Sequence, residues 1–175
     1  LNRTATLWHD LETMKIPGIQ AVYVPPESTG WFWAIVSVDT LYPGHSNHVA
    51  NAVIATTTGH HGTKGIIIVD KDIAVDNWND VFWALSVRFD PKRSAQIIER
   101  GRSSPLDPSL PANERWIGSR LILDATIPYE WEDKPQEIFM DRGVMEQVSA
   151  RWDEYGFTIP DPIPELIDRL SRPKG

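Results

Sequence analysis

The sequence predicts an α/β sandwich, in which one mixed β-sheet carries helices on both faces. Two neighbouring stretches carry this prediction. Residues 65–69 form a continuous apolar run that is β-branched at every position after Gly65, as a strand covered on both faces requires. After acidic residues at Asp70, Asp72 and Asp76, apolar side chains recur with the period of a helix. That apolar stripe consists of Trp78, Val81, Phe82, Leu85 and Phe89. Strand, acidic turn and helix make half of a β/α unit, around which the other elements can be arranged.

The first third of the chain predicts a helix, a β-hairpin and a second helix. The first helix covers Thr6–Lys15. The hairpin pairs a strand at Ile19–Val24 with an aromatic and β-branched strand at Trp31–Val38, antiparallel across a connection that contains two prolines. The second helix runs from Asn47 to about Thr57, and Ser46 is its expected N-cap.

The remaining elements follow the central strand. Asp76 or Asn77 is expected to cap the next helix, and Pro91 is expected to end it. After it come a short strand at Ala95–Ile98, a long loop at 99–118, a short strand at Leu121–Leu123, a helix at Val144–Tyr155, a proline linker at Ile159–Pro164 and a last helix at Glu165–Leu170. We therefore expect an α/β domain over residues 1–158, followed by a linker and a helical tail over residues 159–175.

Composition limits the classes of protein to which the chain can belong. Its 175 residues, 41% of them hydrophobic, suit one folded domain with a substantial core. The net charge of −7 argues against a protein that coats nucleic acid, and the lack of cysteine excludes disulfides and thiolate metal sites. No apolar run approaches the roughly 20 residues that span a bilayer, so we expect a cytoplasmic protein. The chain starts at Leu1 without a signal-peptide pattern, which indicates a piece of a longer protein.

The turn Gly59–Lys64, with the sequence GHHGTK, is the candidate for an anion site. Backbone N–H groups and one lysine charge can hold a lone phosphate. The spacing of a nucleotide-triphosphate loop is missing and the turn leads into a strand, so we do not expect a nucleotide triphosphatase. On the residues alone, a turn whose Lys64 is merely solvated is an equal alternative.

Histidines and acidic residues admit further readings. His45 with His48, and His60 with His61, could be assembled into a zinc site, but solvated or structural histidines are the simpler reading of this weak spacing. The acidic turn after the central strand could likewise form a cation site or an acid–base pair. Charges where a strand leaves the core are common, so we expect ordinary turn residues there.

The stretch Lys64–Pro91 resembles the C-terminal domain of UbiD-family decarboxylases. The similarity rests on the buried strand, the acidic turn, and the motif residues Asn79, Asp80, Val81, Trp83, Ala84, Ser86, Arg88 and Pro91. Further segments in the order of the family are Val22–Glu27, Pro43–His45, Ser119–Thr126 and Trp152–Phe157. Together they extend the resemblance over nearly the whole chain.

The resemblance implies a non-oxidative carboxy-lyase that decarboxylates an aromatic, heteroaromatic or α,β-unsaturated carboxylic acid. Members use prenylated flavin mononucleotide (prenylated FMN) with a divalent metal, Mn²⁺ or Mg²⁺, and K⁺. The catalytic residues and metal ligands lie upstream of the C-terminal domain, and their motifs are not found here. We therefore expect this chain to be inactive alone and to assemble as a homo-oligomer, a dimer or a hexamer, through this domain.

The resemblance also suggests which residues form the site. Lys64 or Thr58 would contact the cofactor phosphate, and His61 and Gly62 would line the substrate pocket. The long loop would act as a mobile lid. The residues that match the tip of this lid are Ser104, Pro105 and Leu106. A non-catalytic domain for oligomerisation or interaction is the alternative function.

Overall fold

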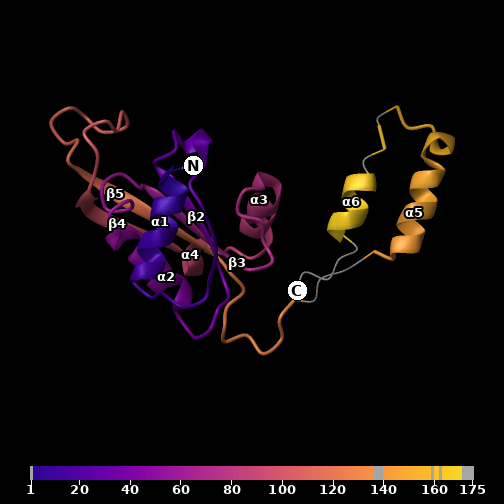
Figure 1. Cartoon of the computed structure of the whole chain (residues 1–175), viewed down its shortest axis with the longest axis horizontal. Coiled ribbons are helices and arrows are strands. Elements are labelled where there is room, and N and C mark those ends of the chain that lie inside the picture. Colours follow the sequence, from indigo (N-terminus) through magenta and orange to yellow (C-terminus); the bar gives the residue numbers. More distant parts are fainter. Residues whose placement is uncertain (1, 136–139, 159, 162, 171–175) are drawn as a thin grey trace. The chain divides into compact units, whose positions relative to one another are not determined.

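The chain, a computed structural model that describes residues 2–135, 140–158, 160–161 and 163–170, divides into two compact units, Leu1–Glu132 and Asp133–Gly175. The first unit contains a five-stranded mixed sheet with helices on both faces (Figure 1). The predicted fold class is therefore confirmed. Within the described residues, no helix is both long enough and apolar enough to cross a bilayer.

The sheet has the strand order β1-β2-β3-β5-β4. Its strands are β1 (Ile19–Tyr23), β2 (Trp33–Val38), β3 (Gly65–Asp70), β4 (Ala95–Arg102) and β5 (Ile117–Ala125). Strand β3 runs parallel to both of its neighbours, β2 and β5, whereas β1 and β4 add antiparallel edges. The continuous β-branched run therefore lies in the middle of the sheet, where both of its faces are covered, as the sequence predicts.

Helices α1 (Asn2–Thr13) and α2 (His45–Ala55) cover one face of the sheet. Fully buried side chains of this layer include Leu7, Leu11, Val36, Val49, Val53, Ile66 and Ile68. Each such side chain stabilises the fold by roughly 1.5–3 kcal/mol. The opposite face packs against α3 (Trp78–Val87) through Val81 and Ala84, which contact the layer of Ile67 and Val69.

The predicted caps are partly right. Asn77 caps α3, since its side chain accepts a hydrogen bond from Asn79 N at 3.0 Å. The prediction that Ser46 caps α2 is wrong. The helix begins two residues earlier than predicted, at His45, after Gly44 in the left-handed region (φ 75°), and Ser46 is buried and donates to the Asp124 carboxylate. The helix therefore starts from a glycine turn, and its first serine is used for a long-range contact.

Pro91 does not end the helix after the central strand. Helix α3 ends at Val87, and Pro91 instead begins the short helix α4 (Pro91–Ser94), where its lack of an N–H costs nothing. Asp90 caps this helix by accepting hydrogen bonds from Lys92 N and Arg93 N.

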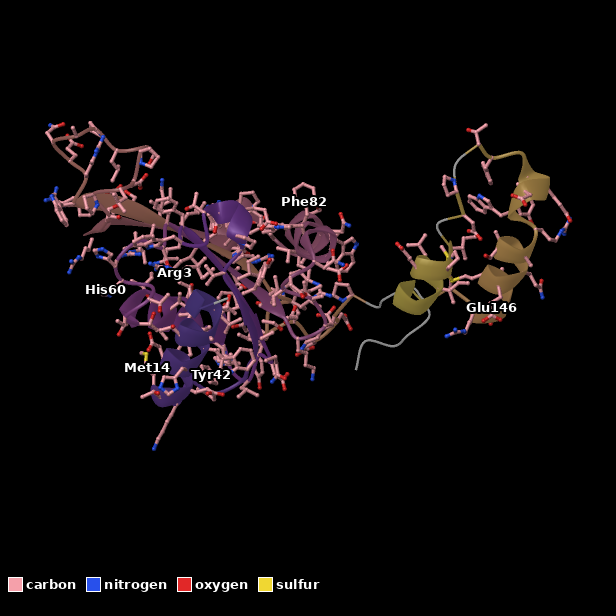
Figure 2. All side chains as sticks on the ribbon, turned by 45° about the horizontal axis from the view of Figure 1, so that its top comes forward. Arg3, Met14, Tyr42, His60, Phe82 and Glu146 are labelled. Atoms are coloured by element: carbon pink, nitrogen blue, oxygen red, sulfur yellow. The ribbon has the colours of Figure 1, made fainter. Side chains whose placement is uncertain are left out.

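The apolar stripe predicted for α3 is confirmed only in part, since Val81 is buried and Leu85 and Phe89 pack against the same layer, whereas Trp78 and Phe82 are exposed. Phe82 is 70% exposed and projects away from the sheet (Figure 2). The inward face also includes Ala84, and the Arg88 guanidinium turns inward to Asp70 and Asp72. A pattern that counts only apolar residues cannot predict that an arginine side chain faces inward.

The predicted loop at 99–118 is too long. Strand β4 continues through Arg102 and β5 begins at Ile117, which leaves a loop of residues 103–116. A bulge between Ile98 and Gly101 interrupts the pairing, and Arg100 adopts φ 57° there. The irregularity hides the alternation that would have revealed the strand.

The second unit consists of α5 (Arg142–Ala150), the 3₁₀ helix η2 (Trp152–Tyr155) and α6 (Ile163–Leu170). Met145, Ile163 and Ile167 form its buried core. In the predicted linker, Ile159 and Pro162 lie outside the described residues, as do residues 171–175 of the predicted tail. The predicted domain boundary after residue 158 stays a prediction.

Candidate functional site

The turn between α2 and β3 folds back tightly on the end of α2. The Thr56 hydroxyl donates to Val53 O at 2.7 Å and accepts from Gly59 N at 2.8 Å. A Cβ atom at Gly59 would lie 1.8 Å from Val53 O, so only glycine allows this approach. The turn is thus fixed at its beginning by backbone packing.

Arg120 on β5 fixes the rest of the turn. Its guanidinium donates to Gly59 O at 3.0 Å, to His60 O at 2.6 Å and also to Thr63 O. It also donates to Arg102 O, at 2.8 Å, where the loop 103–116 leaves β4. Arg120 is only 4% exposed, and burial lowers the pKa of its guanidinium from the ordinary value. A buried cation that contacts carbonyl oxygens therefore lies directly behind the turn.

Lys64 ends the turn and joins it to the loop 103–116. Its backbone is held between two strands, because Lys64 N donates to Phe32 O and Lys64 O accepts from Leu121 N, both at 2.7 Å. The Lys64 ammonium donates to Asp107 Oδ1 at 3.1 Å and to Ser109 Oγ at 2.6 Å. The side chain is 34% exposed, so solvent reaches this junction.

The loop is polar where it faces Lys64. Asp107 is 1% exposed, and its Oδ1 also accepts from Ser109 N at 3.0 Å and from Ser109 Oγ at 2.8 Å. Burial raises the pKa of the Asp107 carboxyl, but the hydrogen bonds from Ser109 and Lys64 together outweigh it, so the pKa lies below the ordinary 3.8. Asp107 therefore stays ionised at neutral pH.

The predicted lid residues point in opposite directions. Ser104 is buried, and its hydroxyl accepts from Leu106 N at 3.2 Å. Leu106 is 71% exposed and Pro105 is half-buried between them. An apolar tip above a polar base is the arrangement that a covering loop needs, but a lid role stays a prediction.

The predicted pocket residues lie against Trp31. The His61 ring lies 5.9 Å from the Trp31 ring, and a Cβ atom at Gly62 would lie 1.9 Å from Trp31 Nε1. That indole N–H is buried and has no hydrogen-bond acceptor among the described residues. Thr58, the other phosphate candidate, receives a contact from α1 instead, since Thr58 N donates to Asp10 Oδ2 at 3.4 Å. The structure thus joins Lys64, but not Thr58, to the loop.

Three residues of this constellation were missed: Asp107, Ser109 and Arg120. The sequence Asp-Pro-Ser was a usable signal, because Asp and Ser two residues apart form a local turn that orients the carboxylate. Arg120 interrupts an otherwise apolar strand, and a charge at an inward position requires several partners. Nothing in the sequence shows that both residues meet the turn that holds Lys64.

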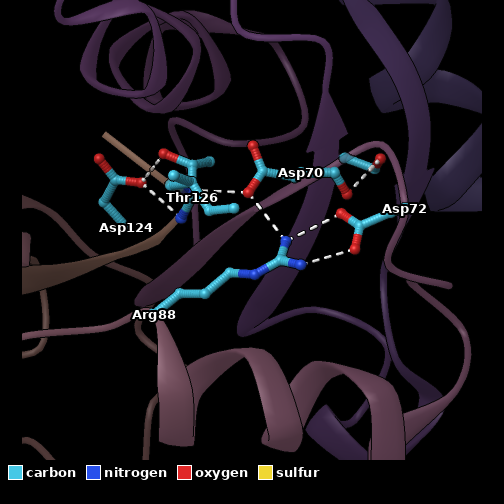
Figure 3. A network of polar contacts seen from close by, with 7 residues as sticks. Asp70, Asp72, Arg88, Asp124 and Thr126 are labelled. Atoms are coloured by element: carbon cyan, nitrogen blue, oxygen red, sulfur yellow. Dashed lines mark hydrogen bonds and ion pairs between the residues drawn. The ribbon is translucent and has the colours of Figure 1, made fainter. Parts of the chain in front are cut away.

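The acidic turn after β3 forms a structural ion network (Figure 3). Arg88 makes two contacts to Asp72, at 2.8 and 2.6 Å, and one to Asp70 Oδ2 at 2.9 Å. Ile127 N also donates to Asp70, at 2.8 Å. Burial raises the pKa of Asp70, while Ile127 N and Arg88 oppose the rise. These contacts connect the ends of β3 and β5 to α3, as expected for turn residues.

The described residues contain no group of three or more histidine, aspartate or glutamate side chains that could hold a metal ion. His45 is buried, and its two ring nitrogens contact Leu41 N at 3.2 Å and Pro17 O at 2.9 Å, so it is a structural histidine. A cavity of about 390 Å³ lies elsewhere, under α3. Its lining is Glu27, Ser28, Trp33, Ile67, Trp78, Leu85 and Leu123, which includes none of the predicted site residues.

The chain is similar to one protein-family model and to several solved structures. A family model described as the 3-octaprenyl-4-hydroxybenzoate carboxy-lyase C-terminal domain matches residues 1–125. The vanillic acid decarboxylase of Sedimentibacter hydroxybenzoicus in its open form is 29% identical, with a TM-score of 0.71 over 88% of this chain and 32% of that chain. The apo 3,4-dihydroxybenzoic acid decarboxylase of Klebsiella pneumoniae is 25% identical, with a TM-score of 0.65 over 83% and 32%.

A third solved structure extends the likeness in fold. It is a UbiD-class enzyme from Pelotomaculum thermopropionicum in complex with FMN, 22% identical, with a TM-score of 0.71 over 82% of this chain and 31% of that chain. This chain spans about a third of the length of each of these three structures.

Proposed function

Because the chain belongs to the UbiD family, in which it corresponds to the C-terminal domain, we propose that it forms part of a non-oxidative decarboxylase of an aromatic, heteroaromatic or α,β-unsaturated acid. The two relatives at 25% and 29% identity are named for aromatic hydroxy acids, which supports an aromatic substrate. We assign the catalytic residues and the ligands of the divalent metal and K⁺ to the two thirds of the relatives that this chain does not cover.

One observation carries the role of this chain: Lys64, at the end of the turn, reaches across to the loop 103–116. An ammonium group has three N–H donors, and two of them contact Asp107 and Ser109. The ammonium also lies 5.3 Å from the centre of the Phe32 ring, and the exposed part of the side chain gives a phosphate oxygen access to it. Arg120 adds a second, fixed positive charge behind the turn. These residues fit the phosphate of a flavin mononucleotide.

The flavin, when bound, supplies the electron sink for the loss of carbon dioxide. The residues of this chain would contribute placement and shielding. Lys64 would hold the phosphate, His61 and Gly62 would line the substrate pocket, and the loop with Leu106 at its tip would exclude water. No step is assigned to a metal ion, because the described residues offer no set of ligands for one.

The phosphate contact is tested in the protein that carries this chain, with Lys64→Met and with Lys71→Met as the matched control. Lys71 also forms an ion pair, with Asp39 at 3.4 Å, but on an exposed surface. A charged hydrogen bond is worth about 1.5–3 kcal/mol, so Lys64→Met is expected to weaken flavin binding roughly 10- to 100-fold. Bound flavin is measured by absorbance, and carbon dioxide release is measured with an aromatic acid.

Unchanged flavin content in Lys64→Met would reject the phosphate contact. If carbon dioxide release were also unaffected, the second candidate function, a domain for oligomerisation, would gain support. That candidate is favoured by exposed apolar side chains outside the loop tip, namely Phe82, Val87, Ile97 and Trp116. The two functions are compatible, since a domain that covers a cofactor can also join subunits.

A further inference from the structure

We propose that Asp107 occupies an anion subsite at Lys64, and that an incoming phosphate monoester displaces it and releases the loop 103–116 from the turn. The inference rests on the proposed function in one respect, the approach of a phosphate to Lys64. It adds that the same lysine holds the loop, so that loop position and phosphate occupancy are coupled.

The loop depends on Lys64 for its attachment. Within the part of the chain that the structure describes, the only hydrogen bonds that link residues 104–115 to a distant element are those from Lys64 to Asp107 and Ser109. The others lie inside the loop or at its base, such as Asp107 N to Ser104 O at 3.0 Å and Ser103 N to Trp116 O at 3.0 Å. Lys64 therefore supplies the long-range hydrogen bonds of the loop, beside the side chain of Leu110, which lies next to Gly118 of β5.

Loss of this tether would leave the fold of the loop intact. Asp107 Oδ1 would keep both of its hydrogen bonds from Ser109, which lie two residues along the chain. The hydrogen bond from Leu106 N to Ser104 Oγ would also remain. The loop would thus move as a unit when Lys64 changes partner, because its internal turns do not involve the lysine.

The difference in negative charge between phosphate and the Asp107 carboxylate favours phosphate as the partner of Lys64. A phosphate monoester carries about 1.5 to 2 negative charges at neutral pH, whereas Asp107 carries one. Both anions on the same ammonium would repel each other at close range, and a partly exposed ion pair such as Lys64–Asp107 is a weak tether. Solvent access at Lys64 gives the phosphate a path to the lysine. The carboxylate is therefore the group that leaves.

The coupling is tested by limited trypsin cleavage after Arg115, an exposed residue of the loop. The 175-residue chain is digested with FMN, with riboflavin, which lacks the phosphate, or with inorganic phosphate against chloride of equal ionic strength. Cleavage after Arg151, exposed in the second unit, serves as the internal rate reference. We expect FMN and phosphate to raise the relative cleavage rate at Arg115 about tenfold, and riboflavin and chloride to leave it unchanged.

Three variants make the test specific. Lys64→Met should cleave fast with or without phosphate, and Lys71→Met should behave as wild type. Asp107→Asn removes the competing charge with little change of shape, so it should bind phosphate roughly tenfold more tightly, as measured by shifts of amide NMR peaks in the turn 59–64.

Each other outcome rejects a defined part of the proposal. NMR shifts in the turn without faster cleavage would show that phosphate binds beside Asp107, which overturns the exchange but leaves the proposed phosphate contact standing. Slow cleavage of Lys64→Met would show that the lysine does not tether the loop, and the inference would fail. No NMR shift at saturating FMN would reject the phosphate contact and the exchange together.

Discussion

Two arginines in the first unit have buried guanidinium groups, and different partners stabilise the two charges. Arg88 is neutralised by Asp70 and Asp72, which ties a helix to the end of the central strand. Arg120 contacts four carbonyl oxygens, so its charge is solvated by backbone dipoles and not cancelled. Five donors in a planar fork make this possible, and lysine could not reproduce it. The uncancelled charge lies behind the turn where an anion is proposed to bind.

At the residue scale, the Asp70 carboxyl gives a prediction with a defined sign. Its pKa is raised in the folded state by burial, above the ordinary 3.8. In the pH window between these two values the folded chain binds the proton more tightly than the unfolded chain, so the contribution of Asp70 to stability falls as the pH rises through it. The free energy of unfolding of wild type minus that of Asp70→Asn should therefore decrease upwards from about pH 4, as measured by urea unfolding.

The subtraction isolates Asp70 from Asp107, whose pKa is lowered and whose contribution has the opposite sign. Stability from Asp107 is present above pH 3.8 and is lost as the pH falls through its lower folded value. A difference between wild type and Asp70→Asn that grows with pH would contradict the assignment of burial as the dominant cause.

The sequence predicted single residues where the cause was local. Lys64 was singled out because a glycine-rich turn with one lysine is a local pattern. Its partner Asp107 lies 43 residues away, and the contact exists only because β3 and β5 are neighbours in the sheet. Thr58 was an equal candidate on sequence, and only the fold shows its amide directed to Asp10.

At the scale of elements, the central strand was predictable because residues 65–69 are all apolar and strands buried on both faces need that composition. Helix α3 was predicted, but its end was placed at Pro91 and not at Val87, and the inward direction of Arg88 was missed. Strands β4 and β5 were predicted too short. The outer half of β4 carries Glu99, Arg100 and Arg102, which read as loop residues, and pairing with β5 resumes only beyond the bulge, at Gly101 and Arg102.

The apolar tip of the loop 103–116 allows a test of the proposed lid role. Leu106→Gly removes the apolar tip, which is 71% exposed and contributes little to the stability of the chain. If the tip becomes buried when the loop covers the substrate, about 1.5–3 kcal/mol is lost, and turnover should fall roughly 10- to 100-fold in the protein that carries this chain. Leu41→Gly, at another exposed loop leucine, is the matched control. Equal turnover in both variants would show that the loop tip does not contribute to the active site.

At the scale of the whole chain, the two units have separate cores. The buried apolar residues of the sheet layers all lie between Leu7 and Ala125, and those of the second unit are Met145, Ile163 and Ile167. The family match ends at residue 125 as well. The sequence assigns residues 133–158 to the first domain, and this boundary stays a prediction.

Two truncated chains test whether the boundary lies after Glu132 or after residue 158. Because no core residue of the sheet layers lies beyond Ala125, a chain that ends at Glu132 should keep its near-ultraviolet circular dichroism and melt within a few degrees of the full chain. A chain that ends at residue 158 keeps α5 but loses Ile163 and Ile167, so α5 should become accessible to protease while the sheet stays intact. If instead only the longer truncation product is stable, residues 133–158 stabilise the sheet domain and the boundary lies after 158.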